Sequence, residues 1–315
     1  MKLVIDAGIT RLDVVAHGRE LASLMGRDKG EDGARVYTWP DSEEQRVASI
    51  ADPVLMTDHH QIGILGETDP VVRDTVAALY GSRTRITRYD DTEIHFDQSR
   101  YPGVWGPSID TILFCRALSK MELGPIKTSI EVGAGSGFIT KYLLKHDPTL
   151  ERATMVDMMP AAIRACQDAI EDPRARYYTG DGMEFLEHAR ADLVISNPPY
   201  IPRPQSIDDN PYEGVDLMVG MIQHAETFLN PGGKLLLNYS DLCADIADAA
   251  ISKAGLSQRV VDSMRVPLKV FNVLNNEEWL RFLVEEKGMK AERHRGYDYW
   301  HTIKVVAIER QTPAS

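Results

Sequence analysis

The sequence predicts an α/β fold with a doubly wound, mostly parallel sheet and a smaller N-terminal α+β region. From about residue 108 onward, short apolar segments alternate with helical patterns, which is typical of parallel strands joined by crossover helices. A glycine-rich loop follows the first strand of this series, and a proline-rich loop follows the fourth. Because ligands of such sheets bind beyond the carboxyl ends of the strands, both loops are expected to contribute to a binding site.

The elements of the α/β region are expected from their apolar spacing and their Gly and Pro boundaries. The expected strands are 128–132, 153–156, 176–178, 191–196 and 234–237, with a last strand at 302–309 that enters antiparallel. The expected helices are 109–121, 138–145, 160–170, 216–228 and 241–254, with another at 277–286. The helix over 216–228 is expected to stop at Asn230–Pro231–Gly232–Gly233.

The first part of the chain is assigned to a separate region. Residues 1–100 are expected to form this N-terminal region, with a possible substrate role, and residues 101–315 the main domain. Within it, a strand is expected at 3–6, helices at 13–24 and 70–80, and a hairpin that turns at Asp90–Asp91.

Charge and composition narrow the classes of partner. The chain has 315 residues and a formal net charge of -12. An acidic surface repels phosphate backbones, which argues against nucleic acid and leaves a protein or a small molecule as the expected partner.

Several other signals are missing from the sequence. The three cysteines form no CxxC pair, and His59–His60 lacks the spacing of metal ligands, so neither a disulfide framework nor a metal site is expected. No segment approaches the ~20 apolar residues of a membrane helix, and the N-terminus has no apolar core of signal-peptide length. The expected location is the cytoplasm.

The glycine loop runs from Glu131 to Gly137 between a strand and a helix. Its glycines allow sharp turns and let a ligand approach the main chain closely. A nicotinamide fingerprint would need Gly or Ala where Phe138 stands, and a phosphate loop would need Lys followed by Ser or Thr. The spacing therefore indicates a cofactor loop of another kind.

Two acids follow the next two strands. Asp157, with Met158 beside it, stands about 20 residues after the loop, where a carboxylate can accept hydrogen bonds from ribose hydroxyls. A helix N-cap before Pro160 is the alternative for Asp157. Asp181, between Gly180 and Gly182, can accept a hydrogen bond from an exocyclic adenine amine or can simply be a turn residue.

The loop after the fourth strand reads Asn197–Pro198–Pro199–Tyr200. The prolines fix the backbone and remove donors, which leaves loop carbonyls free to accept. Asn197 adds a side-chain carbonyl, and Tyr200 a flat ring that can stack on a planar substrate. Such a loop can hold an NH2 group by its two hydrogens and aim the nitrogen lone pair at an electrophile.

These motifs carry a resemblance to a family. The glycine loop, Asp157 and the Asn197–Tyr200 loop look like those of class I methyltransferases. The strings DLVISNPPYIP and FLNPGGKLLL resemble the HemK/PrmC-type protein-glutamine methyltransferases, and VWGPSIDTILFCRAL is similar to the segment that precedes their cofactor loop. The resemblance covers roughly residues 92–257. Residues 1–90 do not look like the small helical domain of the release-factor enzymes in this family, and the tail over 266–300 is longer.

The resemblance implies S-adenosylmethionine as the cofactor. It places these residues at the cofactor: Asp110, Thr111, Glu131, Gly133, Ala134, Gly135, Gly137, Asp157, Met158, Asp181, Gly182 and Asn197. It further implies that Asn197 and the Pro198 carbonyl hold an acceptor amide while Tyr200 packs on it. The implied reaction is N-methylation of a glutamine side chain in a protein. Methylation of a small-molecule nitrogen in a biosynthetic pathway, or of a nucleic-acid amino group, stays open.

Overall fold

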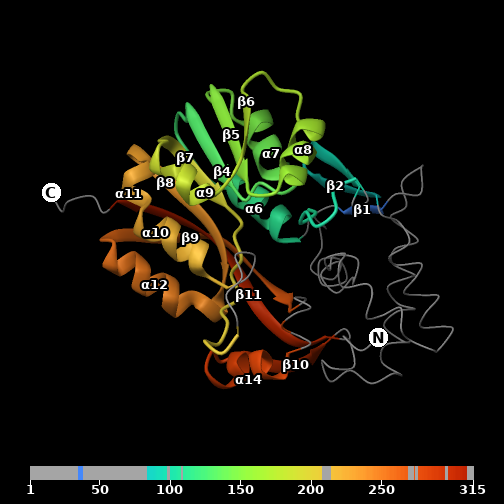
Figure 1. The fold of residues 1–315 in the computed structure, drawn as a ribbon, viewed down its shortest axis with the longest axis vertical. Helices are drawn as coiled ribbons and strands as arrows, with labels where there is room; N and C mark the ends of the chain where they lie inside the picture. The colour runs from blue at the N-terminus through green and yellow to red at the C-terminus, as the bar shows by residue number, and fades with distance from the viewer. Residues whose placement is uncertain are drawn as a thin grey trace. The chain divides into compact units, whose positions relative to one another are not determined.

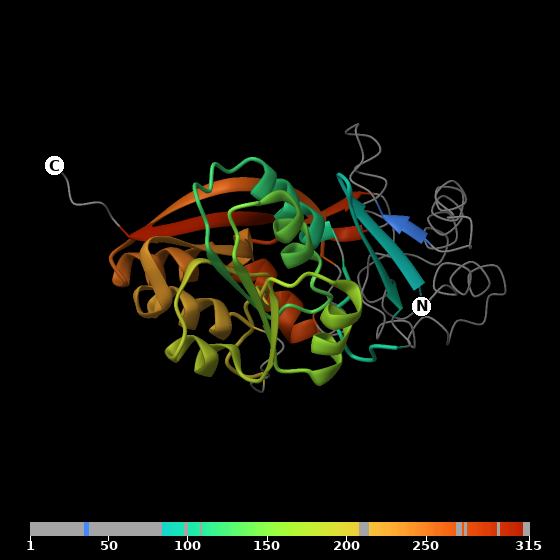
Figure 2. The same ribbon diagram turned by 90° about the horizontal axis from the view of Figure 1, so that it is seen from above.

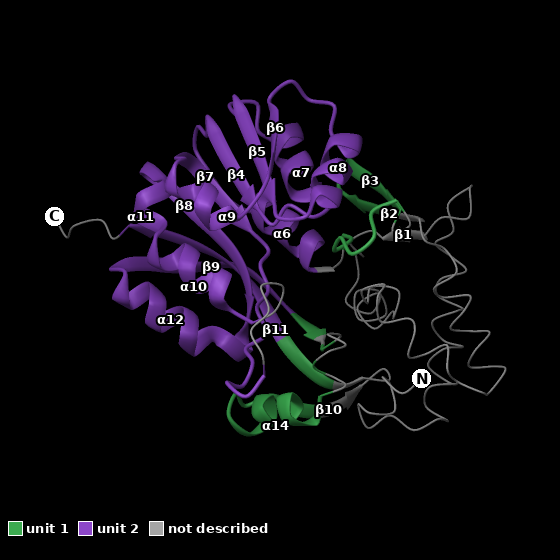
Figure 3. Cartoon of the chain, viewed as in Figure 1, with its two compact units in different colours: residues 1–109, 265–301 green, residues 110–264, 302–315 purple. Residues whose placement is uncertain are grey.

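The computed structural model describes residues 35–37, 84–97, 100–107, 109–207, 214–268, 273, 276–294 and 297–310 (Figure 1). The chain divides into two compact units, coloured separately in Figure 3. One unit comprises residues 1–109 and 265–301, and the other comprises 110–264 and 302–315. The domain boundary expected near residue 100, and a substrate role for the region before it, stay predictions.

The larger unit is built on a twisted sheet of parallel strands with an antiparallel edge. Its strands are β4 (Thr128–Val132), β5 (Arg152–Asp157), β6 (Ala175–Thr179), β7 (Ala191–Ser196), β8 (Leu229–Ser240), β9 (Leu256–Pro267) and β11 (Tyr297–Arg310). They follow the order β11-β8-β7-β4-β5-β6, and β9 pairs with β11. The β8–β7–β4–β5–β6 pairs are parallel and β11–β8 is antiparallel. The expected doubly wound sheet with an antiparallel last strand is confirmed.

One helix precedes the first of these strands, and the others lie in the connections between successive strands. They are α6 (Ile109–Ser119), α7 (Phe138–His146), α8 (Pro160–Ala169), α9 (Gly182–Glu187), α10 (Asp216–Gln223), α11 (Ala225–Phe228) and α12 (Ala244–Lys253). Alternate residues of β8, such as Leu235 and Leu237, pack against Met218 and Phe228 in a continuous apolar core. Figure 2 shows α10 and α12, which contact each other, together on one side of the long strand β11.

The smaller unit contains its own three-stranded sheet. Strands β1 (Arg35–Tyr37), β2 (Thr84–Tyr89) and β3 (Thr92–Asp97) pair in this order. Asp90 has φ 52° in the turn between β2 and β3, a left-handed conformation that Asp tolerates, so the expected hairpin is confirmed. The unit also holds α14 (Glu277–Glu285), and β10 (Lys290–His294), which pairs with the first residues of β11.

Several expected boundaries move in the structure. The helix expected over 216–228 is broken at His224 into α10 and α11, and β8 begins at Leu229 rather than at 234. The strand runs through Pro231–Gly232–Gly233, where a side chain on Gly233 would lie 3.1 Å from the carbonyl oxygen of Ala191 on the neighbouring strand β7. The short elements α9 and β10 were not expected. The strand and helices expected at 3–6, 13–24 and 70–80 lie outside the described residues.

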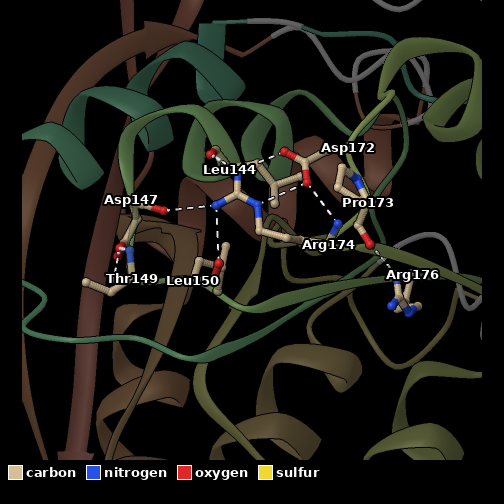
Figure 4. A network of polar contacts seen from close by, with 8 residues as sticks. All are labelled: Leu144, Asp147, Thr149, Leu150, Asp172, Pro173, Arg174 and Arg176. Atoms are coloured by element: carbon tan, nitrogen blue, oxygen red, sulfur yellow. Dashed lines mark hydrogen bonds and ion pairs between the residues drawn. The ribbon is translucent and has the colours of Figure 1, made fainter.

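Arg174 ties the end of α7 to the start of β6 (Figure 4). Its guanidinium donates to the carbonyl oxygens of Leu144 at 2.5 Å, Leu150 at 3.2 Å and Asp147 at 3.3 Å. It also forms a two-point ion pair with Asp172, at 3.0 and 2.8 Å, and these hydrogen bonds lower the pKa of that carboxyl group. Carbonyls that the last turn of α7 leaves unpaired thus find donors.

Among the helices that the structure describes, none is long and apolar enough to cross a membrane.

Candidate active site

The candidate site lies where the strand order reverses. β4 is flanked by β5 and β6 on one side and by β7 and β8 on the other, so β4 and β7 are neighbours whose chain connections run in opposite directions. This is the place where doubly wound sheets open a crevice for ligands. The carboxyl ends of the two strands are joined by Ser196, whose hydroxyl donates to the carbonyl oxygen of Val132 at 2.8 Å. The glycine loop and the Asn-Pro-Pro-Tyr loop therefore start side by side.

The glycine loop is shaped by left-handed residues. Gly133, Gly135 and Gly137 have φ of 70°, 53° and 75°, a region that side chains disfavour. At Gly137 a Cβ atom would lie 3.0 Å from the sulfur of Cys166, so this glycine is required by packing against α8. At Gly133 no atom of the described residues would lie within 4 Å of a Cβ, so these residues leave space for a ligand above the main chain.

Glu131 is buried beneath this loop. Its carboxyl group accepts hydrogen bonds from the hydroxyl and the backbone N–H of Thr140, the latter at 3.1 Å. Burial raises the pKa of Glu131 to about 8, against the lowering effect of these hydrogen bonds. The side chain thus supports the first turn of α7. The predicted contact of Glu131 with the cofactor stays a prediction.

Asp157 connects the loop to the next strand. One carboxylate oxygen accepts from the backbone N–H of Gly135 at 3.0 Å, and the other accepts from that of Met159 at 2.9 Å. Burial raises its pKa. The N-cap residue of α8 is Met159, not Asp157. Met158 is 46% exposed, so its side chain can pack against a ligand. Each carboxylate oxygen retains acceptor capacity for a ribose hydroxyl.

Asp181 and Gly182 have structural roles of their own. Asp181 is the N-cap of α9, where one carboxylate oxygen accepts from Met183 N and Glu184 N at 2.7 and 3.0 Å. The other oxygen has no partner among the described residues and can accept from a ligand amine. A Cβ on Gly182 would lie 2.4 Å from Cγ1 of Val132, so only glycine allows α9 to begin this close to β4.

The Asn-Pro-Pro-Tyr loop is held by the first turn of α6. The side-chain amide of Asn197 donates from Nδ2 to Oδ2 of Asp110 at 2.9 Å. The phenol of Tyr200 donates to the same oxygen at 3.4 Å. Asp110 is buried, and its other oxygen accepts from the backbone N–H of Thr111 at 2.9 Å. The structure thus brings four predicted site residues together through one carboxylate.

Asn238 completes this group and was not expected from the sequence. It lies on β8 beside the end of β7, is fully buried, and donates from Nδ2 to Oδ1 of Asn197 at 2.8 Å. Its position as the polar residue directly after the apolar run Leu235–Leu237 is the sequence signal that could have identified it. Pro198 is buried, as expected for the rigid part of the loop.

The ring of Tyr200 is partly buried and packs against the apolar core. Burial and the neighbouring Asp110 carboxylate raise the pKa of its hydroxyl group well above the usual range. The hydroxyl is therefore a hydrogen-bond donor at neutral pH and not a base. The predicted stacking of this ring on an acceptor stays a prediction.

The donor and acceptor groups of the site fit a cationic cofactor better than a phosphate. Asp157 and Asp181 place carboxylates beside the glycine loop, Glu131 adds a buried carboxyl group that is mostly protonated at neutral pH, and none of the described Lys or Arg side chains pairs with them. The main chain at Gly133 is open to a ligand. Carboxylates repel a polyphosphate and favour a positively charged sulfonium or ammonium group.

Comparison with known families agrees with this geometry. The family of the methyltransferase small domain matches residues 108–243, which include both loops and the first turn of α6. Residues 108–243 thus carry a class I methyltransferase domain. The methyl donor of this class is S-adenosylmethionine, which the carboxylates and the open glycine loop of this domain fit.

Relatives of the methyltransferase domain differ in what their names say they methylate. A release factor glutamine methyltransferase of Geobacter sulfurreducens is 30% identical over 142 residues, covering 40% of this chain and 50% of that protein. A ribosomal RNA large subunit methyltransferase G of Magnetococcus marinus is 30% identical over 159 residues, covering 49% and 40%. A 4-amino-L-phenylalanine/4-methylamino-L-phenylalanine methyltransferase of Streptomyces pristinaespiralis is 27% identical over 224 residues, covering 61% and 76%. The chain thus spans about half the length of the first of these relatives.

Proposed function

We propose that this protein transfers the methyl group of S-adenosylmethionine to a planar nitrogen, and that the acceptor is a glutamine side-chain amide of a protein. One observation carries the proposal. Asn197 directly follows β7 beside the glycine loop, and Asp110 and Asn238 hold its amide in one orientation. A loop that follows a strand at the switch point of the sheet, with a fixed amide, suits an acceptor that itself presents an NH2 group.

The chain's own part in the reaction is to position and polarise the acceptor. The bound cofactor supplies an electrophilic methyl group. Oδ1 of Asn197 takes one hydrogen bond from Asn238 and has capacity for a second, from an N–H of the acceptor. Accepting that hydrogen bond raises electron density on the nitrogen and stabilises the positive charge that develops there. Holding the reactants in line contributes up to ~7–11 kcal/mol to lowering the barrier.

A small-molecule amine is the second candidate. The Streptomyces relative, whose name gives an aromatic amine as acceptor, aligns over 61% of this chain, compared with 40% for the Geobacter glutamine methyltransferase. The longer alignment is the observation that supports an acceptor of this kind as the second candidate. An aromatic amine also presents a planar nitrogen with two N–H bonds, so the same role of Asn197 applies.

The test supplies S-adenosylmethionine with an isotope-labelled methyl group to the full chain. Three acceptors are offered separately: a bacterial release factor, 4-amino-L-phenylalanine and ribosomal RNA. We expect label on a glutamine of the release factor, identified by mass spectrometry of its peptides. Label on the amino acid alone would replace the first candidate by the second, and label on RNA would contradict both.

One variant tests the role of Asn197 in this assay, and a second serves as its control. Asn197→Ala removes the proposed hydrogen-bond acceptor and should abolish transfer. Asn230→Ala removes an asparagine at the opposite edge of the sheet, which donates to Asp192 at 2.8 Å, and should transfer methyl groups like the wild type. Equal activity of Asn197→Ala and the wild type would contradict the proposed role of Asn197.

A further inference from the structure

The carboxamide of Asn238 is unusual because one of its two polar ends is unpaired. Asn238 is fully buried on β8. Its Nδ2 donates to Asn197, but its Oδ1 has no hydrogen-bond partner among the residues that the structure describes. Burial of an unpaired acceptor destabilises a folded protein, so some other contact must hold the amide in this orientation.

The orientation follows from a directed series of hydrogen bonds that starts at Asp110. A carboxylate oxygen only accepts, so Asn197 must turn its NH2 group toward Asp110 and its Oδ1 toward Asn238. Oδ1 of Asn197 then faces Asn238, whose NH2 group is the donor that the described residues provide at that position. Turning the Asn238 amide over would place two oxygens 2.8 Å apart. Turning Asn197 over as well would bring its oxygen against Asp110.

We propose that Asn238 is a positioning residue: together with Asp110 it forms a relay that fixes Asn197 with its oxygen, and not its NH2 group, available to the methyl acceptor. This inference rests on the proposed function for its catalytic consequence. The relay itself is a property of the fold. The unpaired Oδ1 is the consequence of directing the Asn238 NH2 group at Asn197.

The proposal is tested by exchanging the residue types at the two ends of the relay, Asp110 and Asn238. In Asn238→Asp the introduced carboxylate faces Oδ1 of Asn197, so two acceptors meet. In Asp110→Asn the introduced NH2 group faces either the NH2 group of Asn197 or the backbone N–H of Thr111, so two donors meet. Each single variant therefore contains one mismatched contact. The double variant restores both contacts of Asn197, which is then turned over, while the hydroxyl of Tyr200 must accept from the NH2 group introduced at position 110 and no longer donate there. We expect its melting temperature to fall by clearly less than the sum of the two single shifts.

Transfer activity separates orientation from folding. With its restored contacts, the double variant should remain folded, but Asn197 then presents its NH2 group to the acceptor. We expect kcat to fall by up to about 100-fold in Asn238→Asp and in the double variant, with an unchanged KM for the acceptor. Asn230→Asp is the matched control, since it makes the same substitution on β8 at the opposite edge of the sheet, and should retain kcat.

The outcomes distinguish this inference from the proposed function. Additive shifts in melting temperature would overturn the relay, whatever the activity. Wild-type kcat in the double variant would overturn the claim that the oxygen must face the acceptor. If the wild type transferred no methyl group to any of the three acceptors, the proposed function would fail, while the melting temperatures would still decide the relay. Affinity for S-adenosylhomocysteine, measured by calorimetry for each variant, separates a loss of cofactor binding from these effects.

Discussion

Glu131 accepts hydrogen bonds from both the hydroxyl and the backbone N–H of Thr140, nine residues further along the chain. The N-cap of α7 is Gly137, which has no side chain to satisfy the N–H groups of the first turn. The buried carboxyl group at the end of β4 performs this function from a distance. The stability of the cofactor loop is thereby linked to a group that titrates near neutral pH.

The first prediction concerns this titration. The ordinary pKa of a Glu side chain is 4.5, whereas the pKa of Glu131 in the folded protein is about 8. The folded state therefore holds this proton more tightly than the unfolded state. The resulting stabilisation is complete below pH ~4.5 and is lost as pH rises to about 8, with a slope of at most about 1.4 kcal/mol per pH unit. Urea unfolding of the wild type and Glu131→Gln between pH 5 and 8 measures it. The gap between the two curves should change with pH, and parallel curves would contradict the assignment.

The second prediction concerns the contact of Gly182 with Val132. A Cβ at position 182 would lie 2.4 Å from Cγ1 of a β-branched side chain with little rotational freedom. We expect Gly182→Ala to lower the free energy of unfolding by about 1–3 kcal/mol, and Val132→Ala to recover part of this loss. Gly220→Ala is the control, because its nearest neighbour is Met183 at 3.6 Å and alanine is the better helix former. Equal effects at the two glycines would be inconsistent with the clash.

The third prediction concerns Arg174, whose guanidinium serves three carbonyl oxygens and Asp172. Arg174→Met leaves these partly buried acceptors without a donor and should cost about 1–3 kcal/mol of unfolding free energy. Arg174→Lys keeps the charge but not the planar fork, so it should recover only part of the loss. Arg176→Met is the control, since the partners of this exposed side chain among the described residues are the neighbouring carbonyls of Pro173 and Ala175. Chemical unfolding of the three variants decides the matter.

The fourth prediction concerns affinity for the methyl donor. Asp157→Asn removes a charged acceptor that we expect to bind the ribose, and should weaken binding of S-adenosylmethionine by about 10- to 100-fold, or ~1.4–2.8 kcal/mol. Asp192→Asn changes a carboxylate that accepts backbone N–H groups from Lys127 and Thr128 at the other edge of the sheet, and should leave the affinity unchanged. Titration calorimetry gives both values. Similar losses in the two variants would show that the effect is not local to the cofactor loop.

Much of the fold follows from local sequence, because apolar spacing determines which residues each strand buries. β4 and β7 begin and end where the pattern predicts, at Thr128–Val132 and Ala191–Ser196. The start of β8 could not be placed in this way. Residues 230–233 carry turn signals, yet a close approach to β7 draws them into the strand. Such a contact depends on the neighbouring strand and not on the segment itself.

In the candidate site, too, local sequence predicted some features, while others depend on residues that are distant in the sequence. Motifs indicated the two loops and the residues in them, but not the hydrogen bonds among them. Asp110 and Asn197 are 87 residues apart in the sequence, and Asn197 and Asn238 are 41 apart. Asn238 belongs to no motif, and its role depends entirely on which strand pairs with β7. The pairing of β7 with β8 is therefore what makes it part of the site.

The division of the chain into units has a practical consequence. The chain leaves the methyltransferase domain after Met264 and re-enters it at Thr302 within β11, which is the antiparallel partner of β8. Cutting away residues 1–109 would therefore not isolate the domain, and cutting the chain after Met264 would deprive β8 of a neighbour. A minimal version should replace residues 265–301 by a short linker, so that β11 can still complete the sheet.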